Sequence, residues 1–187
     1  VDVTTQLPTS FGPKVGRVLI TQSVDANGKK MPSSTAGGVA YINVWGASNY
    51  AYYSPALVYY NNLGAGNPTY VAEASSHEMG HNLGLSHDGT TSTAYYAGQG
   101  SGFVSWAPIM GSAYYKNVTQ WSKGEYLNAN QKQDDINLIK TKLAYRTDDH
   151  GNNNLSPTFL AVDATGTITA SNPETDPNNT NPGNKGI

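Results

Sequence analysis

Three of the chain's four histidines, His77, His81 and His87, lie within one eleven-residue stretch. Residues four apart on a helix lie on one face, so the imidazoles of His77 and His81 can reach one cation together. Gly84 can leave the helix with a positive φ, and a chain reversal there would bring His87 back as a third nitrogen ligand. Three neutral nitrogen ligands with an open fourth position are typical of catalytic zinc sites. The spacing therefore predicts one catalytic zinc ion.

A glutamate, Glu78, directly follows the first of these histidines. It is not needed as a ligand, and at this position its carboxylate points toward the water that a catalytic zinc ion binds. A carboxylate so placed can take a proton from that water, so we predict Glu78 as the general base. The chain contains no cysteine, which excludes a thiolate zinc site, a cysteine nucleophile and disulfide bonds.

The run from His77 to His87 follows the pattern H-E-x-x-H-x-x-G-x-x-H and resembles the zinc signature of the metzincin metallopeptidases. Asp88, directly after the third histidine, makes the run most similar to the adamalysin (reprolysin) subgroup. The resemblance extends from about Gly37 to Tyr145. Over this stretch the chain resembles secreted bacterial metzincins. It implies a zinc-dependent endopeptidase that hydrolyses peptide bonds in protein or peptide substrates.

The resemblance also assigns residues that support the zinc ion. Metzincins carry a methionine turn beneath the metal, and Met110 in the run 108–111 fits that turn by position and type. The carboxylate of Asp88 is implied to tie the histidine segment to this turn, while Gly84 lets the chain leave the helix. Astacins and serralysins place a tyrosine ligand two residues after the methionine, but Ser112 stands there in this chain. We therefore expect no fifth protein ligand.

The resemblance further implies that an extended peptide substrate adds to an edge strand of the sheet. Residues 54–60 match that strand, and Pro55 is typical of an edge, where a missing N–H does little harm. The segment after Met110 is expected to form one wall of a specificity pocket. The residues expected to bind substrate are Ala56, Leu57, Val58, Ala113 and Tyr114.

The elements that must position these residues can be predicted from local patterns. Short apolar runs bounded by turn residues predict strands at 15–20, 39–45 and 56–60. The zinc-binding helix is expected from Thr69 or Tyr70 to Leu83, a second helix over about 130–145, and an irregular loop over 86–105. With the resemblance, these elements predict an α/β, metzincin-like fold. A twisted mixed sheet and the zinc-binding helix would lie over an irregular lower subdomain with a C-terminal helix.

Residues 1–146 are expected to form the catalytic domain. Residues 147–187 are rich in asparagine and proline and are interpreted as a linker or the start of a β-rich C-terminal module. Metzincins open with a strand, a long helix and further strands, whereas the 76 residues before His77 hold the later strands but no convincing long helix. Either this region is naturally short, or the chain is a fragment that lacks the first strand and helix. The second interpretation is favoured.

Composition excludes several other classes of protein. The chain has 11 basic and 13 acidic residues and a formal net charge of −2, so it offers no basic face to nucleic acid or to an anionic membrane. No apolar run approaches the roughly 18 residues needed to cross a bilayer. Acidic residues outside the zinc region are sparse, so calcium is possible but not indicated. The oligomeric state stays open.

The composition also favours an exported protein, because lysine and glutamate are few while asparagine, serine, threonine, glycine and tyrosine are abundant. A signal peptide and any pro-segment are then expected outside this chain. Two alternatives to an active enzyme remain open: a non-catalytic binding module on a metzincin scaffold, and an incomplete, inactive piece of a protease. The intact set of three histidines and one glutamate argues against a non-catalytic binding module, since a site that performs no catalysis does not need all four residues.

Overall fold

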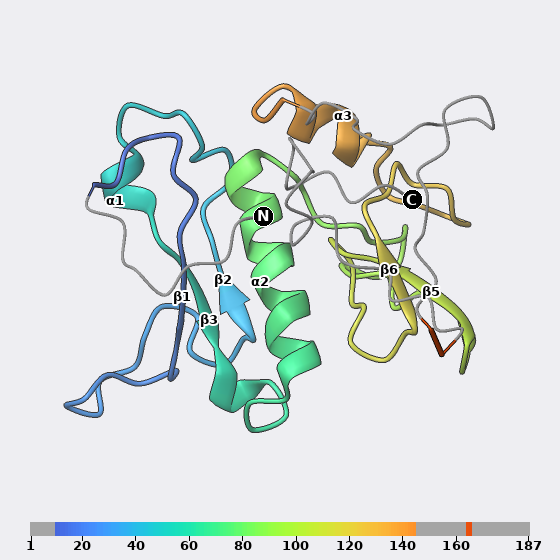
Figure 1. Cartoon of the computed structure of the whole chain (residues 1–187), viewed down its shortest axis with the longest axis horizontal. Coiled ribbons are helices and arrows are strands. Elements are labelled where there is room, and N and C mark those ends of the chain that lie inside the picture. The colour runs from blue at the N-terminus through green and yellow to red at the C-terminus, as the bar shows by residue number, and fades with distance from the viewer. Residues whose placement is uncertain (1–9, 145–163, 166–187) are drawn as a thin grey trace. The chain divides into compact units, whose positions relative to one another are not determined.

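The computed structural model describes residues 10–144 and 164–165. Residues 10–143 form one compact unit, which holds the helices and strands discussed below (Figure 1). The tail expected at 147–187 lies outside the described residues, apart from 164–165. In the part of the chain that is described, no helix is both long enough and apolar enough to cross a membrane.

Three strands form the first sheet: β1 (Val18–Thr21), β2 (Gly38–Val39) and β3 (Ala56–Tyr59). Their order is β1-β3-β2, with β3 parallel to β1 and antiparallel to β2. The sheet is thus mixed, as the sequence predicts, and β1 and β2 form its edges. Two short helical turns, α1 (Tyr50–Tyr53) and η1 (Tyr60–Asn62), flank β3.

The expectation that residues 54–60 form an edge strand is wrong. β3 is the central strand, so its backbone is paired on both sides and cannot accept a substrate strand. Pro55 lies before Ala56, the first paired residue, and its missing N–H therefore leaves the ladder intact. Ala56 and Val58 are fully buried, and Leu57 between them is paired on both sides. These three residues are therefore not placed to bind a substrate by strand addition.

Helix α2 (Pro68–Leu83) carries the first two histidines of the predicted metal site. Asn67 caps its N-terminus, because its side-chain oxygen accepts hydrogen bonds from two backbone N–H groups of the first turn. Pro68 suits the first helical position, where its missing N–H needs no partner. Gly84 ends the helix with a φ of 108°, the left-handed conformation that the sequence predicts there.

The strand expected at 39–45 is present only at its start. After Val39 the chain leaves the sheet, and Asn43 takes a positive φ of 62°. The backbone N–H groups of Asn43 and Trp45 donate instead to carbonyl oxygens in the last turn of α2, at 2.8 and 2.9 Å. Carbonyl groups in the last turn of a helix lack the usual partner four residues on, and the carbonyl oxygen of His81 otherwise accepts from the capping N–H of the glycine that ends the helix. The segment therefore caps α2 rather than extending the strand.

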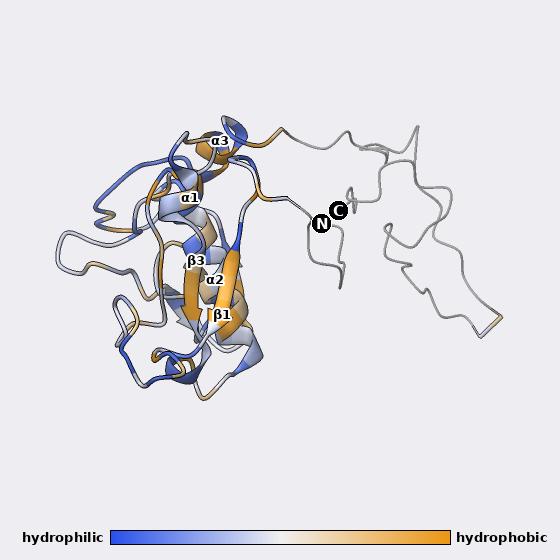
Figure 2. Cartoon of the chain, turned by 90° about the vertical axis from the view of Figure 1, so that its left-hand side faces the viewer, coloured by the Kyte–Doolittle hydropathy of each residue, from blue (hydrophilic) through white to orange (hydrophobic). Residues whose placement is uncertain are grey.

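The core between α2 and the first sheet is small and contains Val58, Leu63 and Ala74. Figure 2 shows β1 and much of β3 coloured as hydrophobic, with α2 behind them. Leu19 and Ile20 of β1 are nevertheless 47% and 52% exposed. The packing that positions the histidine-bearing helix therefore comes mainly from the central strand.

A second sheet, with the order β4-β5-β6, lies on the other side of α2 (Figure 1). Its strands are β4 (Gln99–Ser101), β5 (Val104–Pro108) and β6 (Val118–Gln120). The irregular loop predicted at 86–105 is thus wrong over its last part, where β4 pairs with β5. The lower subdomain contains a small sheet, and β5 leads the chain directly to Met110.

Helix α3 (Asp135–Lys140) is much shorter than the helix expected at about 130–145. The residues before it are held by side chains that reach the histidine segment. Gln131 and Gln133 both hydrogen-bond to segment 86–88. These long-range bonds, which local periodicity does not reveal, hold this part of the chain outside the helix.

Candidate active site

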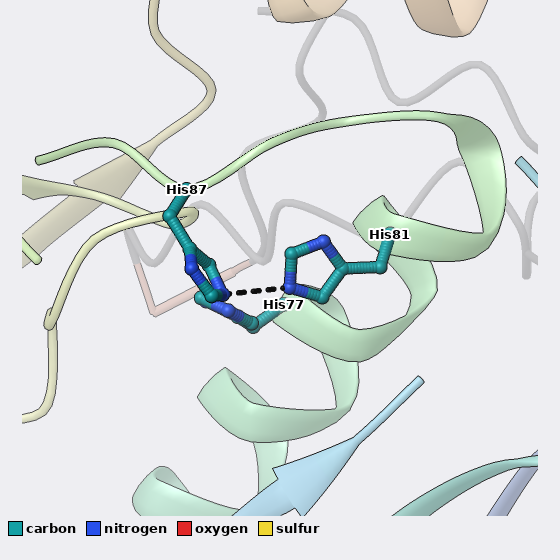
Figure 3. A group of neighbouring side chains, drawn as sticks. All are labelled: His77, His81 and His87. Carbon is teal, nitrogen blue, oxygen red and sulfur yellow. Dashed lines mark hydrogen bonds between the residues drawn. The ribbon is translucent and has the colours of Figure 1, made fainter. Parts of the chain in front are cut away.

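The structure brings His77, His81 and His87 together, as their spacing predicts (Figure 3). One nitrogen of each ring lies within 4.8 Å of the others. His77 and His81 come from adjacent turns of α2, and His87 comes from the segment that turns back after the helix ends. The Nε2 atoms of His81 and His87 are 2.9 Å apart, near the roughly 3.3 Å between two ligands of a tetrahedral zinc ion. The three side chains are therefore close enough together to hold a metal ion.

Backbone carbonyl groups orient two of the three imidazole rings. Nδ1 of His77 lies 2.8 Å from the carbonyl oxygen of Ile109, and Nδ1 of His81 lies 2.8 Å from that of Leu85. A carbonyl oxygen can only accept, so each Nδ1 carries the hydrogen and each Nε2 keeps a free lone pair. Such a second contact fixes the ring and the tautomer of a metal-binding histidine.

Burial favours the neutral form of all three imidazoles. It lowers the pKa of His77 to about 4, although the hydrogen bond to Ile109 acts in the opposite direction. The pKa values of His81 and His87 are also lowered, again mainly by burial. A metal ion binds neutral imidazole, so the protein holds these side chains in the protonation state that a metal requires.

Glu78 lies on α2 beside His77, and its side chain is only 7% exposed. Burial raises its pKa to about 7, so the carboxyl group can both hold and release a proton near neutral pH. It faces the edge strand β2, because a Cβ atom at Gly38 would lie 2.6 Å from Oε1 of Glu78. Sequence reasoning missed Gly38 as a residue of the site, and only the pair Gly37-Gly38 marks it.

Met110 is fully buried beneath the helix that carries the histidines. A Cβ atom at Gly80 would lie 2.5 Å from the sulfur atom of Met110, so the glycine lets the helix rest directly on the methionine. The backbone N–H of Gly111 donates to the carbonyl oxygen of Pro108 at 3.0 Å and closes a tight turn. Met110 therefore lies in a tight turn directly beneath the helix that carries His77 and His81.

Asp88 joins the histidine segment to the methionine turn, but not through its carboxylate. Its backbone N–H donates to the carbonyl oxygen of Met110 at 2.8 Å. The side chain is fully buried, and its Oδ1 accepts hydrogen bonds from Gln131 at 2.6 Å and from Tyr126 at 3.4 Å. The expected tie is therefore made by the backbone, while the carboxylate anchors the chain at 126–131.

Ala113 and Tyr114 lie in the segment that follows the methionine turn, and both border space beside the histidine cluster. With His77 they line a cavity of only about 10 Å³, which holds about one water molecule. Tyr114 also borders a larger cavity of about 310 Å³. That cavity is lined by Gly37, Asn62, Leu63, Gly64, Tyr70, Tyr114 and Tyr115.

Sequence reasoning also missed Tyr95, which lies in segment 86–105. The centroid of its ring is 4.4 Å from that of His87 and 6.2 Å from that of His77. Burial and the charge of Glu78 raise the pKa of its hydroxyl group. Tyr95 is one of 13 tyrosines in the chain, and no local pattern distinguishes it from the others.

The mixed sheet and the histidine-bearing helix are compatible with a metzincin-like fold, and the three histidines could hold a metal ion. Residues 11–88 match a family model described as metallo-peptidase family M12B, reprolysin-like. The match covers less than half of the chain, but it includes the first sheet, α2 and all three clustered histidines. With the histidine cluster, the match supports a similarity of this part of the chain to reprolysin-like metzincins. No curated protein and no solved structure matches the chain significantly.

Proposed function

We propose that the protein is a zinc-dependent endopeptidase that hydrolyses peptide bonds in protein substrates. One observation carries the proposal: a buried carboxyl group, that of Glu78, directly follows His77 on α2, and His77 belongs to a group of three imidazoles that could hold a metal ion. The match to a metallopeptidase family supports the same activity. His77, His81 and His87 would hold one zinc ion, which when bound polarises the scissile carbonyl group and lowers the pKa of its water to about 7.

Glu78 acts as the general base in this proposal. Its carboxylate takes a proton from the attacking water as a C–O bond forms at the peptide carbon. The same proton then passes to the leaving nitrogen as the C–N bond breaks. Burial raises the pKa of Glu78, which opposes the lowering that a bound zinc ion would cause, so the group can first accept the proton and then give it up.

The substrate is proposed to lie along β2 rather than along β3. β2 is an edge strand, and its Gly38 lies directly against Glu78. An extended peptide can add to such an edge through main-chain hydrogen bonds. Ala113 and Tyr114, which border the cavity beside His77, are proposed as one wall of a specificity pocket.

The test is cleavage of an unfolded protein substrate by the 187-residue chain, with zinc measured in the same sample. Glu78→Gln is the matched variant, because it keeps the shape of the side chain but cannot take the proton. Both proteins should hold one zinc ion per chain, and kcat should fall by a factor of roughly 10²–10⁴ in the variant. Loss of zinc from Glu78→Gln would contradict a pure base role, and a parent chain that holds no zinc would overturn the proposal.

Zinc binding without any cleavage by the parent chain would favour the alternative function. The protein would then be a non-catalytic or incomplete metzincin-fold fragment that acts as a binding module.

We also propose that the protein acts outside the cell, which its composition supports. Its absence from the culture medium of the organism that makes it would contradict that location.

A further inference from the structure

The phenol ring of Tyr95 borders the histidine cluster from the side of segment 86–105. It lies 4.4 Å from the ring of His87, centroid to centroid, with an interplanar angle of 45°. The side chain is still 46% exposed, so a bound substrate can reach it. Among the residues that the structure describes, none is a hydrogen-bond partner of its hydroxyl group. Tyr95 thus presents a free donor beside the site.

The backbone next to Tyr95 is held on both sides. Tyr96 donates its N–H to the carbonyl oxygen of Asp88 at 2.7 Å, and its carbonyl oxygen accepts from the N–H of Ser112 at 2.9 Å. The ring of Tyr96 stacks on that of Tyr126, with centroids 4.1 Å apart and planes 3° apart. The segment therefore lies between the histidine segment and the chain after the methionine turn. Tyr96 anchors it, and Tyr95 is left facing the histidines.

Tyr95 also lies near the carboxyl group that is proposed as the base. The charge of Glu78 acts on the hydroxyl group of Tyr95. A phenol hydroxyl group carries its proton near neutral pH and can donate it in a hydrogen bond. The pKa of Tyr114 is raised by burial and by the charges of Glu78 and Tyr95. Its ring, however, packs against that of Tyr70, with centroids 5.4 Å apart. Among the tyrosines that the structure describes, Tyr95 is the one whose ring lies beside the imidazoles of His77 and His87.

We propose that Tyr95 is a catalytic residue whose hydroxyl group donates a hydrogen bond to the carbonyl oxygen of the scissile peptide as that oxygen becomes negatively charged. This inference rests on the proposed peptidase activity. The hydroxyl group keeps its proton and forms no covalent bond, so Glu78 remains the group that transfers a proton. A fixed donor directed at charge that develops in the transition state contributes a factor of roughly 10²–10³ to kcat.

Tyr95→Phe tests the proposal, because it removes only the hydroxyl group and keeps the ring beside His87. We expect unchanged zinc content, a loss of about 100-fold in kcat for a peptide substrate, and a KM within about threefold of the parent value. Tyr52→Phe is the matched control. Tyr52 lies on α1 and is 81% exposed, so this variant should keep the kinetic constants of the parent.

Binding of a phosphinic peptide supplies a readout other than activity. Such a peptide carries a negatively charged oxygen in place of the scissile carbonyl oxygen, so Tyr95→Phe should bind it about 100-fold more weakly than the parent does. The C-terminal product peptide, which begins with the former leaving nitrogen and carries no oxygen at the scissile position, should bind both proteins equally. Titration calorimetry of the zinc-loaded proteins measures both affinities.

Each other outcome overturns the inference in a distinguishable way. A parent-like kcat in Tyr95→Phe would leave the proposed function intact and remove the hydroxyl group from catalysis. Loss of zinc from Tyr95→Phe would show that the residue supports His87 instead. A higher KM with an unchanged kcat would assign it to ground-state binding. A parent chain that holds zinc but does not cleave would overturn both the proposed function and the role of Tyr95.

Discussion

Glu78 and His77 are neighbours in the chain, yet burial shifts their pKa values in opposite directions. The pKa of Glu78 rises to about 7 because burial disfavours the carboxylate, and that of His77 falls to about 4 because burial disfavours the imidazolium. Without a metal ion, both side chains are therefore uncharged between these two values. Metal binding and proton abstraction consequently depend on pH in different ranges.

When the pH is lowered, activity should therefore be lost before zinc is released. Burial lowers the pKa values of all three histidines, that of His77 to about 4, which weakens the competition of protons with zinc. Zinc should therefore stay bound at a pH of about 5.5, below the ordinary pKa of histidine. The base works only as a carboxylate, so kcat/KM should fall as the pH decreases from 7 toward 4.5, the ordinary carboxyl value toward which a bound cation moves Glu78.

Initial rates across this range, with a zinc assay on every sample, check this separation. Activity that stays constant down to pH 4.5 would contradict the role of Glu78 as a base. Zinc that is already lost at pH 6.5, the ordinary pKa of histidine, would contradict the burial effect on His77.

The site residues that could be predicted are those whose positions are determined by residues close to them in the sequence. Helical spacing alone puts His77 and His81 on one face, and the glycine that ends the helix accounts for the return of His87. Gly38 and Tyr95 enter the site through strand pairing and through bonds between distant segments. No window of neighbouring residues contains that information, so both were missed.

At the scale of elements, β2 and α2 approach each other closely where Gly38 meets Glu78. A methyl group at Gly38 would lie 2.6 Å from Oε1 of Glu78 and 2.8 Å from the carbonyl oxygen of Leu57. The carbonyl oxygen belongs to the backbone of the central strand and cannot yield easily, so the glutamate side chain must move. The identity of one strand residue thus decides the position of the base on the neighbouring helix.

Gly38→Ala should therefore keep its zinc and lose about tenfold or more in kcat, since displacing a reacting group by about 1 Å can cost 10²-fold. Gly12→Ala is the matched control, because a Cβ atom there would have no atom within 4 Å. Kinetic and zinc assays on the two variants check the prediction. A Gly38→Ala protein as active as Gly12→Ala would show that β2 does not position the base.

The elements differ in how well local patterns predicted them. Helix α2 was predicted to within two residues because its ends are set locally, by a proline at its start and by Gly84 at its end. The position of β3 in the sheet was predicted wrongly, because strand order depends on pairing between distant segments. Helix α3 was predicted too long because the bonds of Gln131 and Gln133 to segment 86–88 leave no trace in the local apolar pattern.

At the scale of the whole molecule, the site is built from two stretches that lie on either side of residue 88. The stretch that matches the reprolysin-like family supplies the first sheet, α2 and the three histidines. The following stretch supplies Met110 beneath the helix, Tyr95 beside the rings, and the partners of buried Asp88. Both stretches lie within the compact unit of residues 10–143.

A chain that ends at residue 146 should therefore keep one zinc ion and a kcat/KM within about threefold of the full-length value. A chain that ends at residue 125 should lose zinc, because it lacks Tyr126 and Gln131, and a buried acceptor left without its hydrogen-bond partners costs about 1–3 kcal/mol. Zinc content and cleavage of an unfolded protein, measured on both chains beside the full-length protein, check the two expectations.

Loss of activity in the longer chain would place part of the working enzyme within residues 147–187 and would contradict a catalytic domain that ends at residue 146. Zinc binding by the shorter chain would show instead that α2 and His87 hold the metal without support from the anchor of Asp88.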